Sequence, residues 1–128
     1  YKGLFETAIN SDEILTSVKY PINKNDTKLF FDEVTRRHGD YAMAGLIGSI
    51  KQNNKINEEI NLVFFGTGDR PNDAPKTCEY LLKNEYNYSD IKDILKNDID
   101  FASDISSSSD MKAHLSAILV GRMMKELN

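Results

Sequence analysis

The first half of the chain alternates between apolar and polar residues in the manner of β-strands. Residues 14–20 and 29–37 carry this pattern, and Pro21 with the polar residues 23–26 separates them. Alternation with a period of two gives a strand one apolar face, and proline followed by polar residues favours a turn. We therefore predict two strands that form a hairpin.

Two further apolar segments extend the predicted sheet. Residues 43–51 contain several small residues, which suits a strand approached closely by another element, with a short buried helix as the alternative. Residues 60–65 form the clearest strand, and Gly66 and Gly68 end it. Because the links are short, we predict a small antiparallel sheet of three to four strands in the N-terminal half.

The second half of the chain has the spacing of helices. We expect Asp73, followed by Ala74 and Pro75, to cap a first helix, and Ser89 to cap a second. We expect Asp110 to start the last and longest helix. Its predicted apolar stripe consists of Leu115, Ile118, Leu119, Met123 and Leu127. Strands followed by helices predict an α+β domain with three helices packed on one face of the sheet.

Composition and charge limit the classes of partner that the chain can bind. A chain of 128 residues with 40% hydrophobic residues is one domain that can build a core without disulfides or metals. A net charge of −4 argues against binding to nucleic acid or to an anionic membrane surface. The sequence contains no run of about 18 apolar residues, so it predicts no membrane span. Protein and small-molecule partners therefore remain.

The chemistry-bearing side chains do not assemble into a reaction site. Cys78 is the only cysteine, which excludes an internal disulfide and a four-cysteine metal site, and favours a reducing, cytoplasmic compartment. His38 and His114 have no partner at metal-ligand spacing. The segment 66–68, Gly-Thr-Gly, lacks the further residues of a dinucleotide or phosphate loop, so it predicts a plain glycine turn. We expect no catalytic residue and no metal site in this chain.

Two adjacent arginines are the most informative polar residues. If Arg36 and Arg37 lie in a strand, they point to opposite faces, so one pairs within the sheet and the other reaches a neighbouring domain or ligand. An ordinary surface salt bridge to Glu33 or Asp40 is the alternative. We expect Asp40 to cap backbone amides in the turn, and Tyr41 to be a half-buried packing residue.

The segment 31–42 reads Phe-Asp-Glu-Val-Thr-Arg-Arg-His-Gly-Asp-Tyr-Ala. Together with residues 11–15, residues 103–105, residues 112–115 and Arg122, it resembles the C-terminal domain of the FAD-binding (medium) subunit of the xanthine dehydrogenase and carbon monoxide dehydrogenase family of molybdenum hydroxylases. The resemblance covers essentially the whole chain. It implies a CO dehydrogenase flavoprotein C-terminal domain-like fold over residues 11–128.

The resemblance also implies a role. Residues 1–10 would be the connector from a preceding FAD-binding domain, which binds most of the FAD. Electrons would pass from 2Fe-2S clusters in a small subunit through FAD to an acceptor, while a large subunit with molybdopterin oxidises the substrate. The chain would be an accessory domain of an FAD-dependent oxidoreductase that helps to enclose FAD and dock subunits, and the isolated fragment would not be catalytic. The alternative is a stand-alone protein-interaction module of the same fold without a redox role.

By resemblance, the cofactor-binding positions of the family fall on Leu15, Asp32, Arg36, Arg37 and Asp40. Leu15 would border the cofactor, and the loop from Arg36 to Asp40 would lie near the flavin ring. Asp32 occupies a position that is lysine in animal xanthine dehydrogenases, so its charge is reversed.

The sequence departs from the family at two further positions. Met111 stands where the terminal helix often carries tyrosine, and Ala74 replaces an arginine before the first helix. These departures affect the transfer of interface contacts from the family, and they leave the predicted fold unchanged.

Overall fold

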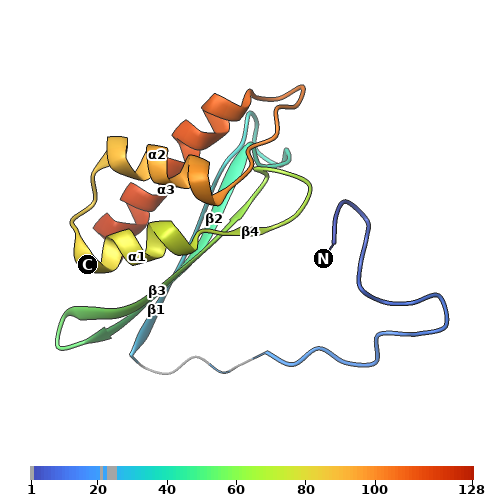
Figure 1. Ribbon diagram of the computed structural model, residues 1–128, viewed down its shortest axis with the longest axis horizontal. Coiled ribbons are helices and arrows are strands. Elements are labelled where there is room, and N and C mark those ends of the chain that lie inside the picture. The colour runs from blue at the N-terminus through green and yellow to red at the C-terminus, as the bar shows by residue number, and fades with distance from the viewer. Residues whose placement is uncertain (1, 21, 23–25) are drawn as a thin grey trace.

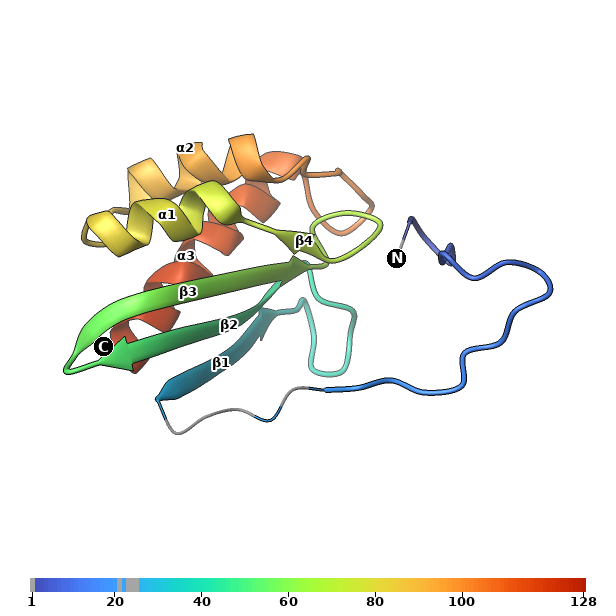
Figure 2. The same cartoon turned by 60° about the horizontal axis from the view of Figure 1, so that its bottom comes forward.

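The computed structural model describes residues 2–20, 22 and 26–128. Figure 1 shows a twisted antiparallel sheet with helices beside it. The four strands, in the order β1-β2-β3-β4, are β1 (Thr27–Val34), β2 (Ala44–Asn53), β3 (Ile56–Phe65) and β4 (Asn72–Asp73). The helices are α1 (Pro75–Lys83), α2 (Tyr88–Asp98) and α3 (Ser109–Leu127). All three helices lie on one side of the sheet (Figure 2), which confirms the predicted α+β fold.

The central hairpin agrees with the sequence. The segment predicted at residues 43–51 lies in β2, which begins at Ala44 and ends at Asn53, so the helical alternative is wrong. The predicted strand at residues 60–65 is the second half of β3, which begins earlier, at Ile56. The two strands are joined through Asn54 and Lys55, which have φ angles of 50° and 65°. Positive φ at both central residues gives the turn a twist that matches the strands.

The predicted strand at residues 14–20 is wrong. This segment forms no strand, and its side chains are exposed. The predicted hairpin is also wrong, because β1 pairs with β2 instead. The turn at Pro21 and residues 23–25 lies outside the described residues, while β1 ends at Val34, three residues earlier than predicted. Alternation marks an amphipathic strand, but a strand also needs a neighbour for its backbone N–H and C=O groups.

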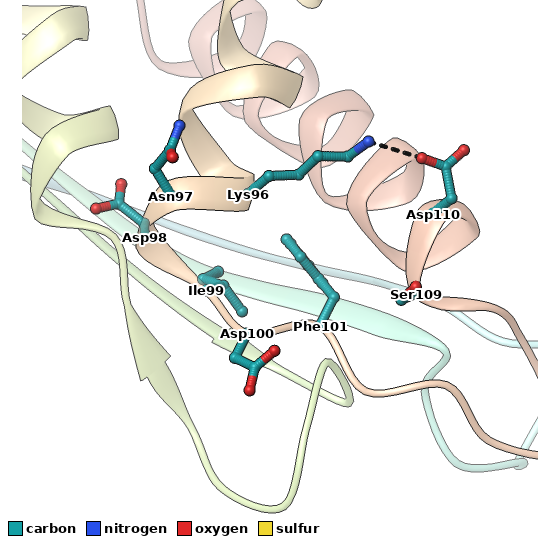
Figure 3. Close-up of a pocket in the computed structure, with 8 residues that line it drawn as sticks. All are labelled: Lys96, Asn97, Asp98, Ile99, Asp100, Phe101, Ser109 and Asp110. Atoms are coloured by element: carbon teal, nitrogen blue, oxygen red, sulfur yellow. Dashed lines mark hydrogen bonds and ion pairs between the residues drawn. The ribbon is translucent and has the colours of Figure 1, made fainter.

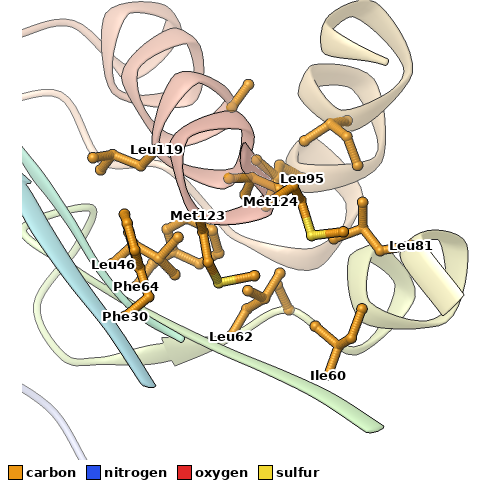
Figure 4. Packing of buried hydrophobic residues seen from close by; sticks show 14 of the residues in the cluster. Phe30, Leu46, Ile60, Leu62, Phe64, Leu81, Leu95, Leu119, Met123 and Met124 are labelled. Carbon is orange, nitrogen blue, oxygen red and sulfur yellow. The ribbon is translucent and has the colours of Figure 1, made fainter. Parts of the chain in front are cut away.

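The core lies between the sheet and the helices, as Figure 4 shows. Leu46 and Ile50 of β2 and Phe64 of β3 are fully buried on the side that faces the helices. Alternate residues of each strand point to this side, and the residues between them point away from it. The helices therefore bury only one face of the sheet.

Helix α3 packs closely against the sheet. Of its predicted stripe, Leu119, Met123 and Leu127 are buried, whereas Leu115 and Ile118 are only partly buried. The buried face also includes small residues that the stripe omitted: Ala113, Ser116 and Ala117. Small side chains allow the helix axis to approach its neighbours, so the buried stripe is rotated from the one expected from the large residues alone.

Helix α1 is capped by a residue from another helix. The predicted cap, Asp73, lies in β4, and the actual N-cap, Ala74, makes no side-chain hydrogen bond. Instead, the Asp98 carboxylate at the end of α2 accepts hydrogen bonds from the backbone N–H of Lys76 at 3.1 Å and of Thr77 at 2.8 Å. A negative charge at a helix N-terminus satisfies free amides and is favoured by the helix dipole.

The other two helices begin near the predicted residues. Asn87 caps α2 by accepting a hydrogen bond from the N–H of Ser89, so the cap lies two residues before the predicted one. Ser108 caps α3 by accepting from the N–H of Met111, so the helix starts one residue before Asp110. In both cases a better-placed side-chain acceptor sits just upstream.

No helix in the described part of the chain is both long enough and apolar enough to cross a membrane.

The contact between Gly48 and α3 generates a stability prediction. A Cβ atom on Gly48 would lie 2.2 Å from the sulfur of Met123, whose side chain is fully buried. We expect Gly48→Val to lower the free energy of unfolding by about 2 to 3 kcal/mol, because overpacking forces side chains off their rotamers. Urea denaturation measures this change. Ser49→Val, on the other face of the same strand, is the control and should be nearly neutral; equal effects would contradict the close packing.

Candidate functional site

The loop between β1 and β2, residues 35–43, carries three of the residues that the family resemblance singled out. The Nη2 of Arg36 donates a hydrogen bond to the carbonyl oxygen of Ser106 at 2.9 Å. Arg37 is exposed, and the N–H of Asp40 donates to the Arg37 carbonyl at 3.1 Å. Gly39 makes the turn with φ of 88°. The loop thus presents an exposed guanidinium next to a second one that is held in place.

The predicted roles of the arginines need correction. Both follow the end of β1, so they do not point to opposite faces of a strand. Among the ion pairs of residues 2–20, 22 and 26–128, none joins Arg36 or Arg37 to Glu33 or Asp40, so the ordinary salt bridge is also wrong. Arg36 uses a carbonyl group of a distant segment instead.

Two other predictions for this loop are wrong. In the described part of the chain, the Asp40 carboxylate accepts no hydrogen bond from a turn amide. Tyr41 is 99% exposed, whereas half-burial was predicted. Both outcomes have the same physical reason, because residues 36–41 of the loop are exposed in the described part of the chain.

Asp32 lies in β1, three residues before this loop begins. Its Oδ2 accepts a hydrogen bond from the Nη1 of Arg122 in α3 at 2.7 Å. The two side chains line a cavity of about 540 Å³ on the helix side of the sheet, together with Lys125 and Glu126. The negative charge at this position is therefore balanced within the chain.

Leu15 is separate from the other candidates. It lies in the N-terminal segment and is 68% exposed. The structure thus brings Arg36, Arg37 and Asp40 together in one loop, places Asp32 in the preceding strand, and does not bring Leu15 to them.

An ion pair between the buried Lys112 and the half-exposed Asp104, which the sequence did not reveal, supports the loop. Lys112 of α3 is only 2% exposed, and its Nζ donates to Oδ2 of Asp104 at 2.6 Å and to the carbonyl of Gly66 at 2.8 Å. The Lys112 ammonium, with the Ser106 hydroxyl, holds the pKa of Asp104 well below its usual range. Asp104 also accepts from the backbone N–H of Ser106 and Ser107.

These bonds form a continuous path from the core to the loop. Lys112 holds Asp104, Asp104 shapes the turn at Ser106, and the Ser106 carbonyl holds Arg36. The sequence motif contained Asp104 and Lys112, but a lysine in a helix is usually exposed. Only its burial in the fold identifies Lys112 as a positioning residue.

The glycine turn after β3 is structural. Gly66 has φ of 73°, and a Cβ atom there would lie 2.5 Å from the carbonyl oxygen of Ala42. Thr67 is buried, and its carbonyl accepts a hydrogen bond from the N–H of Ala102 at 3.0 Å. The backbone of this turn therefore makes contacts within the domain, in agreement with the predicted plain glycine turn.

A cavity of about 570 Å³ lies between the end of α2, residues 99–101 and the start of α3 (Figure 3). Two of its charged side chains already have structural partners. The Nζ of Lys96 pairs with Asp110 at 2.8 Å, and Asp98 caps α1. Among the described residues that line the cavity, no hydrogen bond joins a nucleophile to an adjacent base.

The cysteine and the two histidines complete the candidates for chemistry that the sequence offered. Burial raises the pKa of the Cys78 thiol to about 11, which keeps it protonated and poorly nucleophilic at neutral pH. His38 is exposed, and Nδ1 of His114 shares a hydrogen bond with the Tyr88 hydroxyl at 2.6 Å. Within the described residues, no group of three or more histidine, cysteine, aspartate or glutamate side chains could hold a metal ion.

The ion pair between Lys112 and Asp104 generates a stability prediction. Asp104→Asn leaves the Lys112 ammonium buried without a counter-charge, so we expect a loss of about 2 kcal/mol, discounted because Asp104 is half exposed. Lys112→Met should cost less, about 1 kcal/mol, because the remaining carboxylate is solvated. Urea unfolding tests this order, and adding Lys112→Met to Asp104→Asn should cause no further loss. A larger loss for Lys112→Met would contradict the interpretation.

The same pair gives a pH dependence. Because the pKa of Asp104 is lower in the folded than in the unfolded chain, its contribution to stability is present above the usual aspartate pKa of about 4 and is lost as pH falls further. Asp104→Asn should therefore show a weaker loss of stability in acid than the unchanged chain.

Comparisons with known proteins agree with the fold and the motifs. The sequence profile of the family described as CO dehydrogenase flavoprotein C-terminal domain matches residues 30–127. The chain is 29% identical over 130 residues to the glyceraldehyde dehydrogenase medium chain of Sulfolobus acidocaldarius, covering 99% of this chain and 46% of that protein. It is 22% identical over 125 residues to the caffeine dehydrogenase subunit beta of a Pseudomonas species, covering 95% and 42%.

Solved structures share the fold. Reconstituted CO dehydrogenase from Oligotropha carboxidovorans superposes with a TM-score of 0.82 at 18% identity, over 95% of this chain and 44% of that chain. Quinoline 2-oxidoreductase from Pseudomonas putida 86 gives a TM-score of 0.79 at 22% identity, over 98% and 44%. The chain spans less than half the length of the curated relatives that it matches. Because the profile covers β1 to α3 almost completely, the chain belongs to the CO dehydrogenase flavoprotein C-terminal domain family.

Proposed function

We propose that this domain helps to enclose the FAD of a molybdenum hydroxylase subunit and docks its neighbours for electron transfer. The match of the family profile over residues 30–127 carries this proposal. The relatives named as a medium chain and a subunit beta support it, because both names describe one part of a larger dehydrogenase. The domain would thus be an accessory part of an oxidoreductase.

The division into parts follows the same reasoning. Residues 1–10 would connect to a preceding FAD-binding domain, and residues 11–128 would form the C-terminal domain. The partners would be that preceding domain, a large molybdenum-containing subunit with molybdopterin, and a small subunit with 2Fe-2S clusters. FAD, when bound by the whole subunit, would pass electrons from the clusters to an acceptor.

The residues present fit one wall of a flavin site and not a whole site. None of the four described cavities is lined by Leu15, Arg36, Arg37 or Asp40. The loop 35–43 offers an exposed guanidinium at Arg37, a group suited to carbonyl and phosphate oxygens. Most contacts to FAD would therefore come from the preceding domain.

Asp32 is the position where the charge is opposite to that of the lysine in animal xanthine dehydrogenases, so its effect on a bound flavin needs to be considered. A carboxylate near the flavin ring would disfavour the anionic reduced flavin. The Arg122 guanidinium, 2.7 Å away, offsets this charge. The pair would leave the position close to neutral, so Asp32 would border the cofactor without repelling it strongly.

The proposal predicts how FAD binding is divided. In an absorbance titration, the 128-residue chain alone should show no stoichiometric binding of FAD, because it lacks an enclosing site, whereas the parent subunit should bind about one FAD per chain. Tight, stoichiometric binding by the 128-residue chain would contradict this division. A parent protein that binds no FAD would instead support the alternative, a stand-alone interaction module of the same fold.

The role of the arginine loop is tested in the parent subunit. Arg37→Gln should weaken FAD binding about tenfold, since a hydrogen bond to a charged group contributes on the order of 1.5 kcal/mol or more. The matched control is Lys55→Gln, which removes an exposed positive charge at the β2–β3 hairpin. Isothermal titration calorimetry compares the two, and equal affinities would remove Arg37 from the proposed site.

A further inference from the structure

The sheet has one face that no helix covers. Residues of β1, β2 and β3 that alternate with the core point away from the helices. Phe31, Ile47 and Val63 are paired across the three strands, so their side chains form one apolar row on this face. Phe31 is 65% exposed and Ile47 is 50% exposed. The outer face of an antiparallel sheet is usually polar, so this row requires an explanation.

A second pair of residues extends the row. A Cβ atom on Gly45 would lie 2.1 Å from the ring of Phe65, so the ring lies directly over the glycine. This position brings Phe65 beside Phe31, with ring centroids 5.9 Å apart and planes inclined by 14°. Stacked rings over a glycine form a flat apolar surface that a partner can contact closely.

The apolar character is confined to one end of this face. Leu29 is paired across the sheet with Ser49 and Asn61, and this mixed row separates the apolar end from a polar end. The last row consists of Thr27, Lys51 and Glu59. The apolar end adjoins the loop 35–43, which carries Arg36 and Arg37, whereas the polar end adjoins the β2–β3 hairpin.

The chain before β1 also carries exposed apolar side chains. Figure 2 shows this segment, drawn in blue, extending away from the sheet and the helices. Ile14, Val18 and Tyr20 in this segment are 85%, 57% and 83% exposed. The sheet face and this segment therefore both present exposed apolar side chains within the described residues.

We infer that the apolar end of the uncovered face, formed by Phe31, Ile47, Val63 and Phe65, docks on an apolar surface of the polypeptide that precedes residue 1 in the parent subunit. The inference rests on the proposed function, since it names the partner surface of the same domain. Its further support is length, because the curated relatives are more than twice as long as the matched region. Burial of aromatic side chains at the centre of an interface contributes most to its stability.

The position of the apolar row at one end of the face favours the preceding polypeptide as its partner. The apolar row lies beside the loop proposed to face FAD, so a body that binds FAD would cover both at once. A second copy of the chain is the other possible occupant, and the test below separates the two.

The experiment measures how fast a cysteine on the face reacts with a maleimide. Ile47→Cys is compared in the 128-residue chain and in the parent subunit, and the unchanged chain gives the background because Cys78 is poorly reactive. Ile56→Cys is the matched control. Ile56 is 69% exposed and pairs with Asn53, which lies six residues along β2 from Ile47, or about 20 Å at roughly 3.4 Å per residue. We expect Ile47→Cys to react about tenfold more slowly in the parent, because thiol reactivity requires access, and Ile56→Cys to react equally in both.

Equal rates for Ile47→Cys in the two proteins would overturn the inference. Slow labelling of the 128-residue chain that becomes fast on dilution would also overturn it, in favour of a second copy. If the 128-residue chain does not fold, the ratio of the labelling rates of the two variants within the parent decides, and a ratio near one overturns the inference.

FAD content is measured on the same samples. Bound FAD with fast labelling at residue 47 contradicts the inference alone, whereas slow labelling without bound FAD contradicts the proposed function alone.

Discussion

The packing of α3 against β2 is the contact on which the rest of the structure depends. Strand β2 is paired on both sides, and Gly48 at its centre leaves room for the Met123 side chain of α3. Since side chains alternate along a strand, burying one face of β2 in this way directs Ile47 and its neighbours to the opposite face. The contact that builds the core therefore also determines which apolar side chains stay outside it. In the proposed role, those side chains become an interface.

A buried charge connects this core to the surface. Lys112 lies on the buried side of α3, where an ammonium group is stable only with close partners. Its partners, Asp104 and the Gly66 carbonyl, belong to two loops, one after β3 and one before α3. Through the Ser106 carbonyl, the same bonds position Arg36 in the loop 35–43. The orientation of the loop is thus set by the helix, at a distance from the loop itself.

This arrangement is consistent with a domain that acts together with others. Its polar groups are largely used to hold loops and helix ends, as Asp98 does at α1, and the thiol of Cys78 is kept protonated by burial. Among the described residues, the exposed Arg37 of the loop 35–43 and the apolar end of the outer sheet face lie at the same end of the sheet. Such a surface suits contact with a cofactor and a protein held elsewhere in the subunit, which is the role we propose.

The sequence by itself determined the types of most elements and the family, because periodicity and the motif at residues 31–42 are local properties. It predicted β2, β3 and three helices, and it grouped Arg36, Arg37 and Asp40 in one segment. Only the tertiary structure decided which residues are covered. It showed that residues 14–20 have no strand to pair with and that a carboxylate distant in sequence caps α1. It also showed that Lys112 is buried. Each of these depends on contacts between segments far apart in the chain, which a pattern of neighbouring residues does not record.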